Sequence, residues 1–232
     1  MRYLLKQLFE AESSTYTYFL IDKETNDAII IDPVMETLER DLDLIKELSL
    51  NVKYVLDTHI HADHITSAGK IREVFGAKTV IGAGSNVDCA DILVNDGDIL
   101  YLGSLEIKVV STPGHTNSCT SYYVPKLNYI FTGDALLIRG NGRTDFQEGS
   151  SETLYNSVQK IFKLPLDTII YPAHDYKGRT ASTIDEEMKF NPRIANKTKD
   201  EFIQIMSELK LSKPKKIEKA LPANLKCGKI ID

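Results

Sequence analysis

Three apolar, β-branched segments of this chain run into a histidine or an aspartate. Residues 52–58 (VKYVLDT) lead into a histidine cluster, residues 128–134 (NYIFTGD) end at Asp134, and residues 167–175 (DTIIYPAHD) contain His174. Segments of this kind are typical of buried strands, and open α/β folds usually bind their ligands at the carboxyl ends of strands. The pattern therefore predicts an α/β protein in which the polar clusters form one site.

Further strands and helices are expected between these segments. Residues 16–32 and 97–112 each predict a pair of strands joined by a turn. Residues 35–50 carry apolar side chains at helical spacing, and residues 151–163 predict an amphipathic helix that begins at a capping Ser151. A helix over residues 65–75 and strands over 77–83 and 119–124 complete the expected set.

The chain contains no fixed-period repeat and no linker rich in Pro, Gly or Ser. We therefore expect one domain over residues 1–232, with a charged, mainly helical C-terminal extension from about residue 185. The resulting prediction is a single fold with one site.

Composition excludes several functional classes. The net charge is -5, and no basic patch outside residues 210–219 suggests a nucleic-acid partner. No apolar run is long enough for a membrane span. Cys89, Cys119 and Cys227 form no CxxC pair, so we expect a reducing compartment without a disulfide framework. The expected location is the cytoplasm.

All five histidines lie at expected strand ends beside Gly, Pro or Asp. A single histidine at such a place is more often hydrogen-bonded than metal-bound, but a shared location for all five favours a metal site. Neutral imidazole and carboxylate bind Zn, Fe or Mn, and a carboxylate can also hold the second nitrogen of a ligating imidazole. The candidates are His59, His61, His64, His115, His174, Asp57, Asp63 and Asp134.

The segment HIHADH (59–64) resembles the HxHxDH loop of the metallo-β-lactamase superfamily. Longer segments, among them TPGHTNSCTSYY, FTGDALLIRGNGRTDFQEGS, YPAHDYKGRTASTIDEE and PANLKCG, are similar to the persulfide dioxygenases, also called ETHE1-like sulfur dioxygenases. The resemblance covers nearly the whole chain. It implies an α/β (α+β) fold of the αββα type, in which helices flank two mixed β-sheets.

The resemblance also implies an activity in sulfide and persulfide detoxification. One Fe(II) per chain would be held by His59, His115 and Asp134 while glutathione persulfide, O2 and water are converted to sulfite and glutathione. Two histidines and one carboxylate leave coordination positions free for substrate and O2. The remaining residues of the motifs would support these ligands without binding iron, namely Asp57, His61, Asp63, His64 and His174. A homodimer is implied as well.

Candidate residues for binding the carrier thiol follow Asp134 and His174. Arg139 and Arg143 can bind carboxylates with paired hydrogen bonds, although a salt-bridged loop is the alternative interpretation. Tyr176, Lys177 and Cys227 are weaker candidates, and Cys227 could equally be an inert buried residue. The animal relatives carry Cys in RGCGRTDF where this chain has Asn141, so a thiol role at that position is not expected.

Three questions remain open from the sequence. A glyoxalase II-type enzyme, which hydrolyses a glutathione thioester at two metals, would use the same motif residues. A non-catalytic metal or persulfide binder is the alternative from another class. The persulfide carrier could be coenzyme A or an inorganic polysulfide, and any rhodanese partner is expected to be a separate chain.

Overall fold

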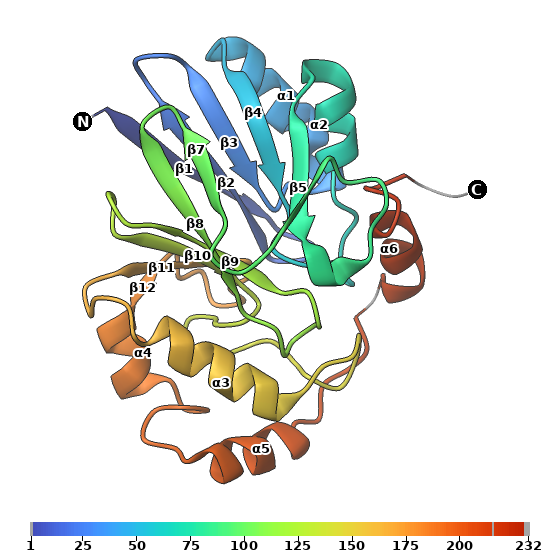
Figure 1. The fold of residues 1–232 in the computed structure, drawn as a ribbon. Coiled ribbons are helices and arrows are strands. Elements are labelled where there is room, and N and C mark those ends of the chain that lie inside the picture. Colours follow the sequence, from blue (N-terminus) through green and yellow to red (C-terminus); the bar gives the residue numbers. More distant parts are fainter. Residues whose placement is uncertain (1, 215, 230–232) are drawn as a thin grey trace.

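Two six-stranded β-sheets pack face to face in the computed structural model, which describes residues 2–214 and 216–229 (Figure 1). The first sheet has the order β1-β2-β3-β4-β5-β6. Its strands are β1 (Tyr3–Glu10), β2 (Thr15–Asp22), β3 (Asp27–Ile31), β4 (Asn51–Leu56), β5 (Lys78–Gly82) and β6 (Ile92–Val94). The second sheet has the order β12-β11-β10-β9-β8-β7. Its strands are β7 (Ile99–Leu102), β8 (Leu105–Ser111), β9 (Thr120–Val124), β10 (Tyr129–Gly133), β11 (Ile169–Pro172) and β12 (Ser182–Thr183).

Both sheets are mixed, and their parallel strands determine where the loops meet. β1, β2 and β3 are antiparallel neighbours, whereas β3, β4, β5 and β6 pair in parallel. In the second sheet, β10 is antiparallel to β9 and parallel to β11. Parallel neighbours end at the same edge of a sheet, so the loops after β3 and β4 lie together, as do those after β10 and β11.

Helices cover the outer faces of both sheets (Figure 1). α1 and α2 pack on the first sheet through a cluster that includes Ile45 and Ile71, and α3, α4 and α5 share a second cluster that includes Val158 and Phe202. α6 lies apart from the other helices, at one side of the sandwich. The helices are α1 (Leu38–Glu47), α2 (Ala68–Phe75), α3 (Ser151–Ile161), α4 (Ile184–Phe190), α5 (Lys199–Ser207) and α6 (Ile217–Asn224). The predicted αββα arrangement is therefore confirmed.

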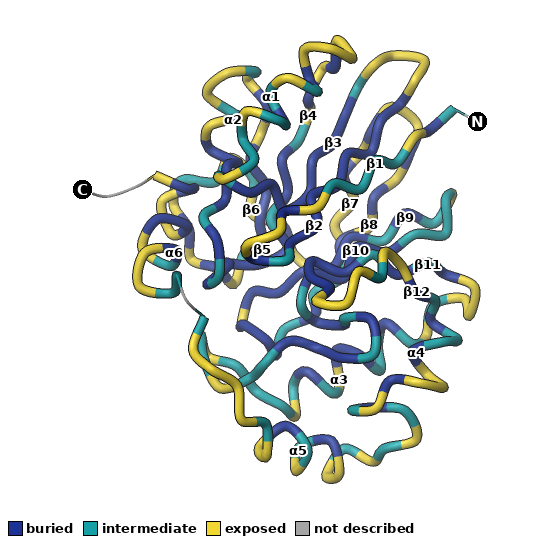
Figure 2. Tube along the Cα trace, turned by 180° about the vertical axis from the view of Figure 1, so that it is seen from behind, coloured by how far each residue is buried: buried dark blue, intermediate teal, exposed yellow. Residues whose placement is uncertain are grey.

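The main hydrophobic core lies between the sheets. Alternate side chains of β2, β3, β8 and β10, including Tyr18, Ile29, Ile107 and Phe131, are buried there, as expected for strands with one face toward the opposite sheet. Figure 2 shows buried residues along both sheets and exposed residues on the outer turns of the helices. In the described ranges, no helix is both long and apolar enough to cross a membrane.

The structure differs from the sequence-based expectations in its details. β1, β6 and β12 were not predicted; β6 and β12 are too short to show a period, and β1 is amphipathic only in part. α3 begins at Ser151, as expected, but its capping residue is Ser150, whose side chain accepts a hydrogen bond from the backbone N–H of Thr153. From residue 184 on, the described chain contains the helices α4, α5 and α6.

The expectation of unpaired cysteines is wrong for two of the three. Cys89 and Cys227 form a disulfide across a sequence separation of 138 residues, with their Cα atoms 6.0 Å apart. Cys119 is a buried free cysteine, and burial raises its thiol pKa to about 12. The absence of CxxC spacing could not exclude a bond between residues that only the fold brings together.

A buried carboxylate in α1 predicts a pH-dependent stability. The Asp41 side chain is fully buried, one oxygen accepts a hydrogen bond from Arg40 Nε at 2.9 Å, and the other has no partner within the described residues. Burial raises the pKa of Asp41 from its ordinary 3.8 to about 6, against a smaller opposing effect of Arg40. The stabilisation from the protonated form is therefore complete below pH 3.8 and is lost as the pH rises through about 6.

We expect Asp41→Asn to remove this dependence, because an amide is uncharged at every pH. The free energy of unfolding should rise by up to about 3 kcal/mol near pH 7.5 and change little near pH 4. Chemical denaturation of both proteins at the two pH values measures the difference. If the free energies of unfolding of the two proteins differ equally at both pH values, the charge of Asp41 does not destabilise the fold.

Candidate metal centre

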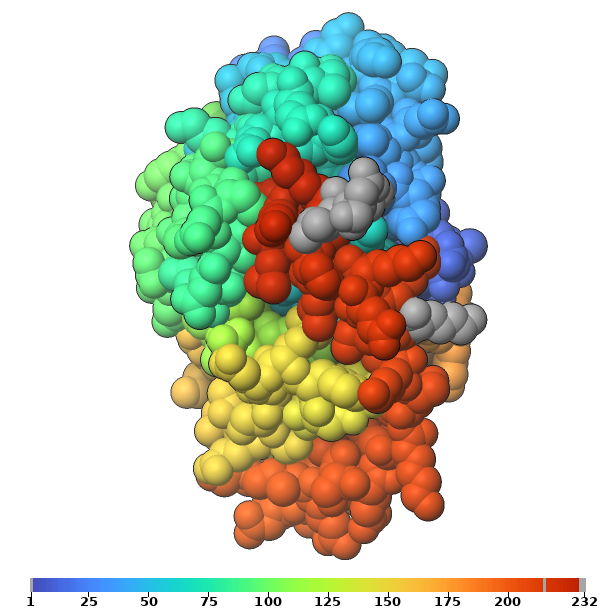
Figure 3. Space-filling view, turned by 90° about the vertical axis from the view of Figure 1, so that its right-hand side faces the viewer, coloured from blue at the N-terminus to red at the C-terminus, as the bar shows by residue number. Residues whose placement is uncertain are grey.

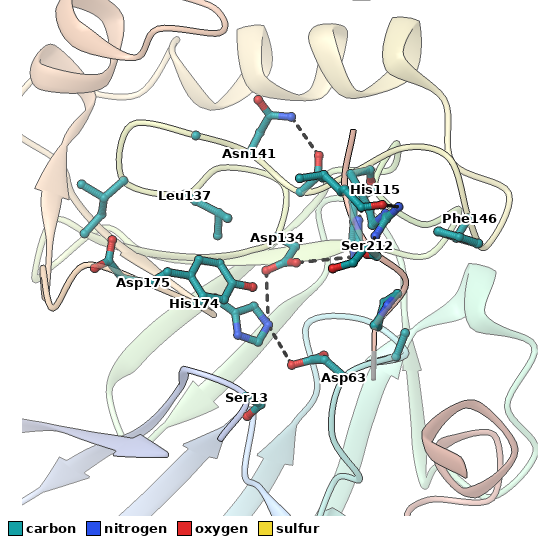
Figure 4. Close-up of a pocket in the computed structure, with 18 of the residues that line it drawn as sticks. Ser13, Asp63, His115, Asp134, Leu137, Asn141, Phe146, His174, Asp175 and Ser212 are labelled. Carbon is teal, nitrogen blue, oxygen red and sulfur yellow. Dashed lines mark hydrogen bonds and ion pairs between the residues drawn. The ribbon is translucent and has the colours of Figure 1, made fainter. Parts of the chain in front are cut away.

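The loops after four strands bring the five histidines of the chain and Asp134 to one place. His59, His61 and His64 lie in the loop that follows β4, and His115 lies between β8 and β9. Asp134 directly follows β10, and His174 follows β11. β4 belongs to the first sheet and the other strands to the second, so the site lies where the ends of both sheets meet (Figure 4).

His59, His115 and Asp134 form a compact group of possible ligands. Each offers one ligand atom, and these atoms lie within 4.8 Å of one another. His115 Nε2 is 3.6 Å from Asp134 Oδ2. The structure thus brings together the three residues that were predicted to hold the metal.

Hydrogen bonds at the second ring nitrogens leave the Nε2 atoms of His59 and His115 free to bind. His115 Nδ1 donates to the carbonyl oxygen of Arg143 at 2.6 Å. Thr58 Oγ1 donates to Asp32 Oδ2, so it can accept from His59 Nδ1 at 3.1 Å. An N–H that is held in this way fixes both the tautomer and the ring orientation of a metal-ligating histidine.

The protonation states also suit metal binding. Burial, with smaller effects of His61 and His115, holds the pKa of His59 well below its usual range. The pKa of His61 is lowered well below its usual range too, chiefly by burial and next by His64. A neutral imidazole has a free lone pair, whereas an imidazolium does not, and ligands must be deprotonated to bind.

A second group lies next to the first. His61, Asp63 and His174 also offer ligand atoms within 4.8 Å of one another. His174 Nε2 is 3.6 Å from Asp63 Oδ2 and 3.6 Å from Asp134 Oδ1, so Asp134 lies between the two groups (Figure 4). Burial lowers the pKa of His174, but Asp134 and Asp63 outweigh it, and the pKa is raised overall. Burial raises the pKa of Asp63, but His174 and His64 outweigh it and hold this pKa well below its usual range.

Three buried polar atoms of the site lack a hydrogen-bond partner in the described part of the chain. They are His61 Nδ1, His64 Nε2 and Asp134 Oδ1. Buried polar atoms are rarely left unpaired in proteins, and imidazole nitrogens together with carboxylate oxygens form the usual donor set for iron, zinc or manganese. The residues of the site therefore fit a metal ion.

Asp57 and His64 support the loop. Asp57 Oδ1 accepts from Thr66 Oγ1 at 2.8 Å, and His64 Nδ1 is 3.2 Å from Asp63 Oδ2. Thr15 Oγ1 is 3.3 Å from Nδ1 of both His64 and His174, which joins the two rings. These contacts orient the side chains around the ligand groups.

A cleft of about 570 Å³ opens beside the two groups. Asp63, His115, Asp134 and His174 are among the residues that line it. The cleft has the size of a typical small-molecule site. Six cationic residues also line it, namely Arg139, Arg143, Lys177, Arg179, Arg193 and Lys213.

The two arginines that were predicted to bind substrate are already paired. Arg139 forms ion pairs with Glu186 and Glu187, which is the salt-bridged alternative. Arg143 binds Asp145 at 2.6 Å and donates to the carbonyl oxygen of Ser212 at 2.6 Å. Both line the cleft, but their guanidinium groups hold protein oxygens.

Two of the three weaker candidates, Tyr176 and Lys177, line the cleft. Tyr176 is 71% exposed, and its ring stacks nearly parallel to that of His174 at an interplanar angle of 11°. Cys227 is bonded to Cys89 and packs with Ile60 and Ile81 away from the cleft lining, so a place in the substrate wall is not supported.

Several residues of the site escaped the sequence reasoning. Asp32 accepts hydrogen bonds from Thr58 N at 2.7 Å and from Thr58 Oγ1, and it lies 3.1 Å from His61 Nε2. It follows β3 just as Asp134 follows β10, so the same signal of a strand followed by a carboxylate could have found it. Thr15 and Arg193 carry no comparable signal. Asn141 is buried, and its Nδ2 donates to the carbonyl oxygen of Gly142 at 2.8 Å.

Comparisons with known proteins agree with this geometry. The model of the metallo-beta-lactamase superfamily matches residues 13–174. The chain is 49% identical over 227 residues to the mitochondrial persulfide dioxygenase ETHE1 of Bos taurus, and the match spans 97% of this chain and 89% of that protein. The Homo sapiens protein of the same name gives the same identity and coverage. The crystal structure of ETHE1 from Myxococcus xanthus superposes with a TM-score of 0.94 at 49% identity, covering 97% of this chain and all of that one.

Proposed function

Because the chain belongs to the metallo-beta-lactamase superfamily and, within it, to the ETHE1 persulfide dioxygenases, we propose that it oxidises a low-molecular-weight persulfide. One persulfide, one O2 and one water would give sulfite, the free thiol and two protons. The observation that carries this function is the ligand group of His59, His115 and Asp134 beside a cleft that admits a small molecule. The protein is an enzyme of the persulfide dioxygenase kind.

The site fits a metal cofactor, and we propose that it is one Fe(II) per chain. His59, His115 and Asp134 would hold it as two histidines and one carboxylate. Iron in such a site would leave coordination positions free for substrate and O2 and would activate the O2, while the persulfide sulfur would supply the electrons that reduce it. The chain itself keeps both imidazoles in the correct tautomer through Thr58 and the carbonyl oxygen of Arg143. His174 lies 3.6 Å from Asp134 and would keep that carboxylate oriented and charged.

The anionic carrier of the persulfide needs cations that are not already paired with carboxylates. Lys177, Arg193 and Lys213 line the cleft and have no carboxylate partner within the described residues. Nη1 of Arg193 donates to the carbonyl oxygen of Asn141 at 2.6 Å, which orients its guanidinium group without neutralising the charge. Arg193 is half-buried, and burial lowers its pKa. A substrate carboxylate would offset this desolvation with charge-assisted hydrogen bonds. We therefore propose Arg193, with the two lysines around it, as the main contact for the carboxylates of glutathione.

We expect Arg193→Gln to raise the KM for glutathione persulfide by about 10- to 100-fold, because a hydrogen bond to a charged group contributes about 1.5–3 kcal/mol. The kcat should change little, since the guanidinium is not among the metal ligands. Oxygen uptake at varied substrate concentration measures both constants. Inorganic polysulfide has no carboxylate and is the matched control, so an equal rise in KM for polysulfide would contradict this role.

The function is tested by measuring oxygen uptake after anaerobic loading with iron. Glutathione persulfide, coenzyme A persulfide and inorganic polysulfide are compared under the same conditions, with sulfite as the measured product. We expect uptake to scale with iron content up to one iron per chain. An iron-filled protein that consumes no O2 with any of these carriers would favour a non-catalytic binder.

The glyoxalase II-type alternative is weaker because the closely similar relatives are persulfide dioxygenases. Its one favourable observation is the second group of His61, Asp63 and His174, which could hold another metal. Two metals per chain together with hydrolysis of S-lactoylglutathione would support that alternative.

A homodimer and a cytoplasmic location remain predictions. The bovine and human relatives are named as mitochondrial proteins. Their names therefore do not support the predicted cytoplasmic location of this chain.

A further inference from the structure

The metal-binding loop of residues 59–66 is held by a side chain from the far end of the sequence. Asn224, in the last turn of α6, is 3% exposed. Its Oδ1 accepts from the backbone N–H of Thr66 at 2.9 Å. Its Nδ2 donates to the carbonyl oxygens of His61 at 2.8 Å and of His64 at 2.9 Å. One amide thus makes three hydrogen bonds to a single loop.

The backbone carbonyl groups of His61 and His64 have no other hydrogen-bond donor within the described residues. His61 and His64 are at most 1% exposed, and Asn224 is the described donor to both of their carbonyl oxygens. Buried backbone groups are nearly always paired in proteins. Without the amide, the loop would have to turn these carbonyl groups toward other donors, and the two imidazoles would turn with them.

A covalent bond fixes the segment that carries Asn224. Cys227, three residues further on, is joined to Cys89 in the loop between β5 and β6. The backbones also fit closely, because a Cβ added to Gly228 would lie 2.0 Å from the carbonyl oxygen of Thr66. Figure 3 shows the C-terminal segment, in red, lying across the junction of the two halves of the molecule. The amide therefore meets the loop from a restrained position.

We propose that Asn224 is a positioning residue of the metal centre, and that the Cys89–Cys227 disulfide keeps its amide in place. Asn224 is neither one of the proposed metal ligands nor a residue that lines the cleft. It acts through the backbone of residues 61–66, which sets the direction of His61 and His64 beside the ligand His59. This inference rests on the proposed function only in that the site holds a metal.

The test compares Asn224→Asp, which has the same shape, with the unmodified protein. The carboxylate keeps an acceptor for Thr66 N–H but loses both donors and faces two carbonyl oxygens. We expect dissociation of Co(II) to a chelator to accelerate by about 10- to 100-fold, as for other residues that support metal ligands. The visible absorption spectrum of the Co(II) protein should also change. Unchanged dissociation and an unchanged spectrum would overturn the proposal.

Two further variants separate positioning from general stability. Ile45→Val shortens a core side chain of α1 and lowers stability without touching the loop, so it should leave the Co(II) spectrum and the dissociation rate unaltered. Cys89→Ser should accelerate dissociation in the same direction as Asn224→Asp but by a smaller factor. If Ile45→Val alters the spectrum as much as Asn224→Asp, or if Cys89→Ser has no effect on dissociation, the corresponding part of the proposal fails.

The outcome is independent of turnover. Co(II) binding and its spectrum are measured without persulfide or O2. A protein that binds metal but consumes no O2 would contradict the proposed function and leave the role of Asn224 testable. Normal oxygen consumption by Asn224→Asp, with normal metal retention, would contradict the role of Asn224 and leave the proposed function standing.

Discussion

Replacing His115 by alanine is expected to abolish metal retention and persulfide oxidation together. His115 has its Nδ1 held by the carbonyl oxygen of Arg143, and its Nε2 is 3.6 Å from Asp134. The substitution removes one of the three proposed ligands. Metal affinity and activity should therefore fall by more than the roughly 10- to 100-fold effect of residues that only support ligands. Iron content after desalting and the rate of oxygen uptake are the two measurements.

The matched variant is His174→Gln, which also removes a buried histidine beside Asp134. With a single iron on His59, His115 and Asp134, this variant should keep one iron per chain with reduced activity. A His115→Ala protein that remains iron-loaded and active would show that the ligand assignment is wrong. Loss of one of two metals from His174→Gln would instead support the dinuclear alternative.

Gly114→Ala is expected to lower the free energy of unfolding by about 3–5 kcal/mol, a large value for a single substitution. The backbone of Gly114 has a φ of 134°, which residues with a Cβ rarely adopt. An added Cβ would lie 2.3 Å from the backbone nitrogen of Leu154 in α3. Either the loop or the helix must shift, and His115 is the next residue, so metal retention should fall as well.

The control for backbone conformation is Gly76→Ala at the end of α2. Gly76 also has a positive φ, 69°, but an added Cβ would meet no atom within 4 Å. We expect a loss of about 1 kcal/mol there from conformation alone, with normal metal retention. Chemical denaturation and metal analysis of both variants separate the two effects, and equal losses would exclude a steric role for α3.

The sequence predicted those parts of the fold that have a local cause. The β2–β3 hairpin, the helices α1 and α3 and the strands β4 and β10 follow from side-chain periodicity and from turn residues, and the structure has them. The ligand group of His59, His115 and Asp134 came from the resemblance to a known family, while the residues alone predicted a metal at the shared strand ends. Side-chain periodicity and family motifs can both be recognised within short segments of the sequence.

Contacts between distant segments were not predictable in this way. The bond between Cys89 and Cys227 and the ion pair between Arg139 and Glu187 join residues whose proximity depends on the complete fold. The sequence therefore leaves both a substrate-binding role and a salt bridge open for Arg139, and the structure shows the salt bridge. Asn224 gives no local signal either, because an asparagine near the end of a helix usually has only a capping role.

The proposed ligands come from both sheets, His59 from the first and His115 and Asp134 from the second. Only protein molecules in which the two sheets are packed together at this edge can bind an ion with all three residues. By mass action, free metal at about 1,000 times its dissociation constant would add about 4 kcal/mol to docking. Cellular proteases cleave the opened forms of proteins. The lifetime of this protein in a cell would therefore lengthen or shorten with the supply of the metal that the site binds.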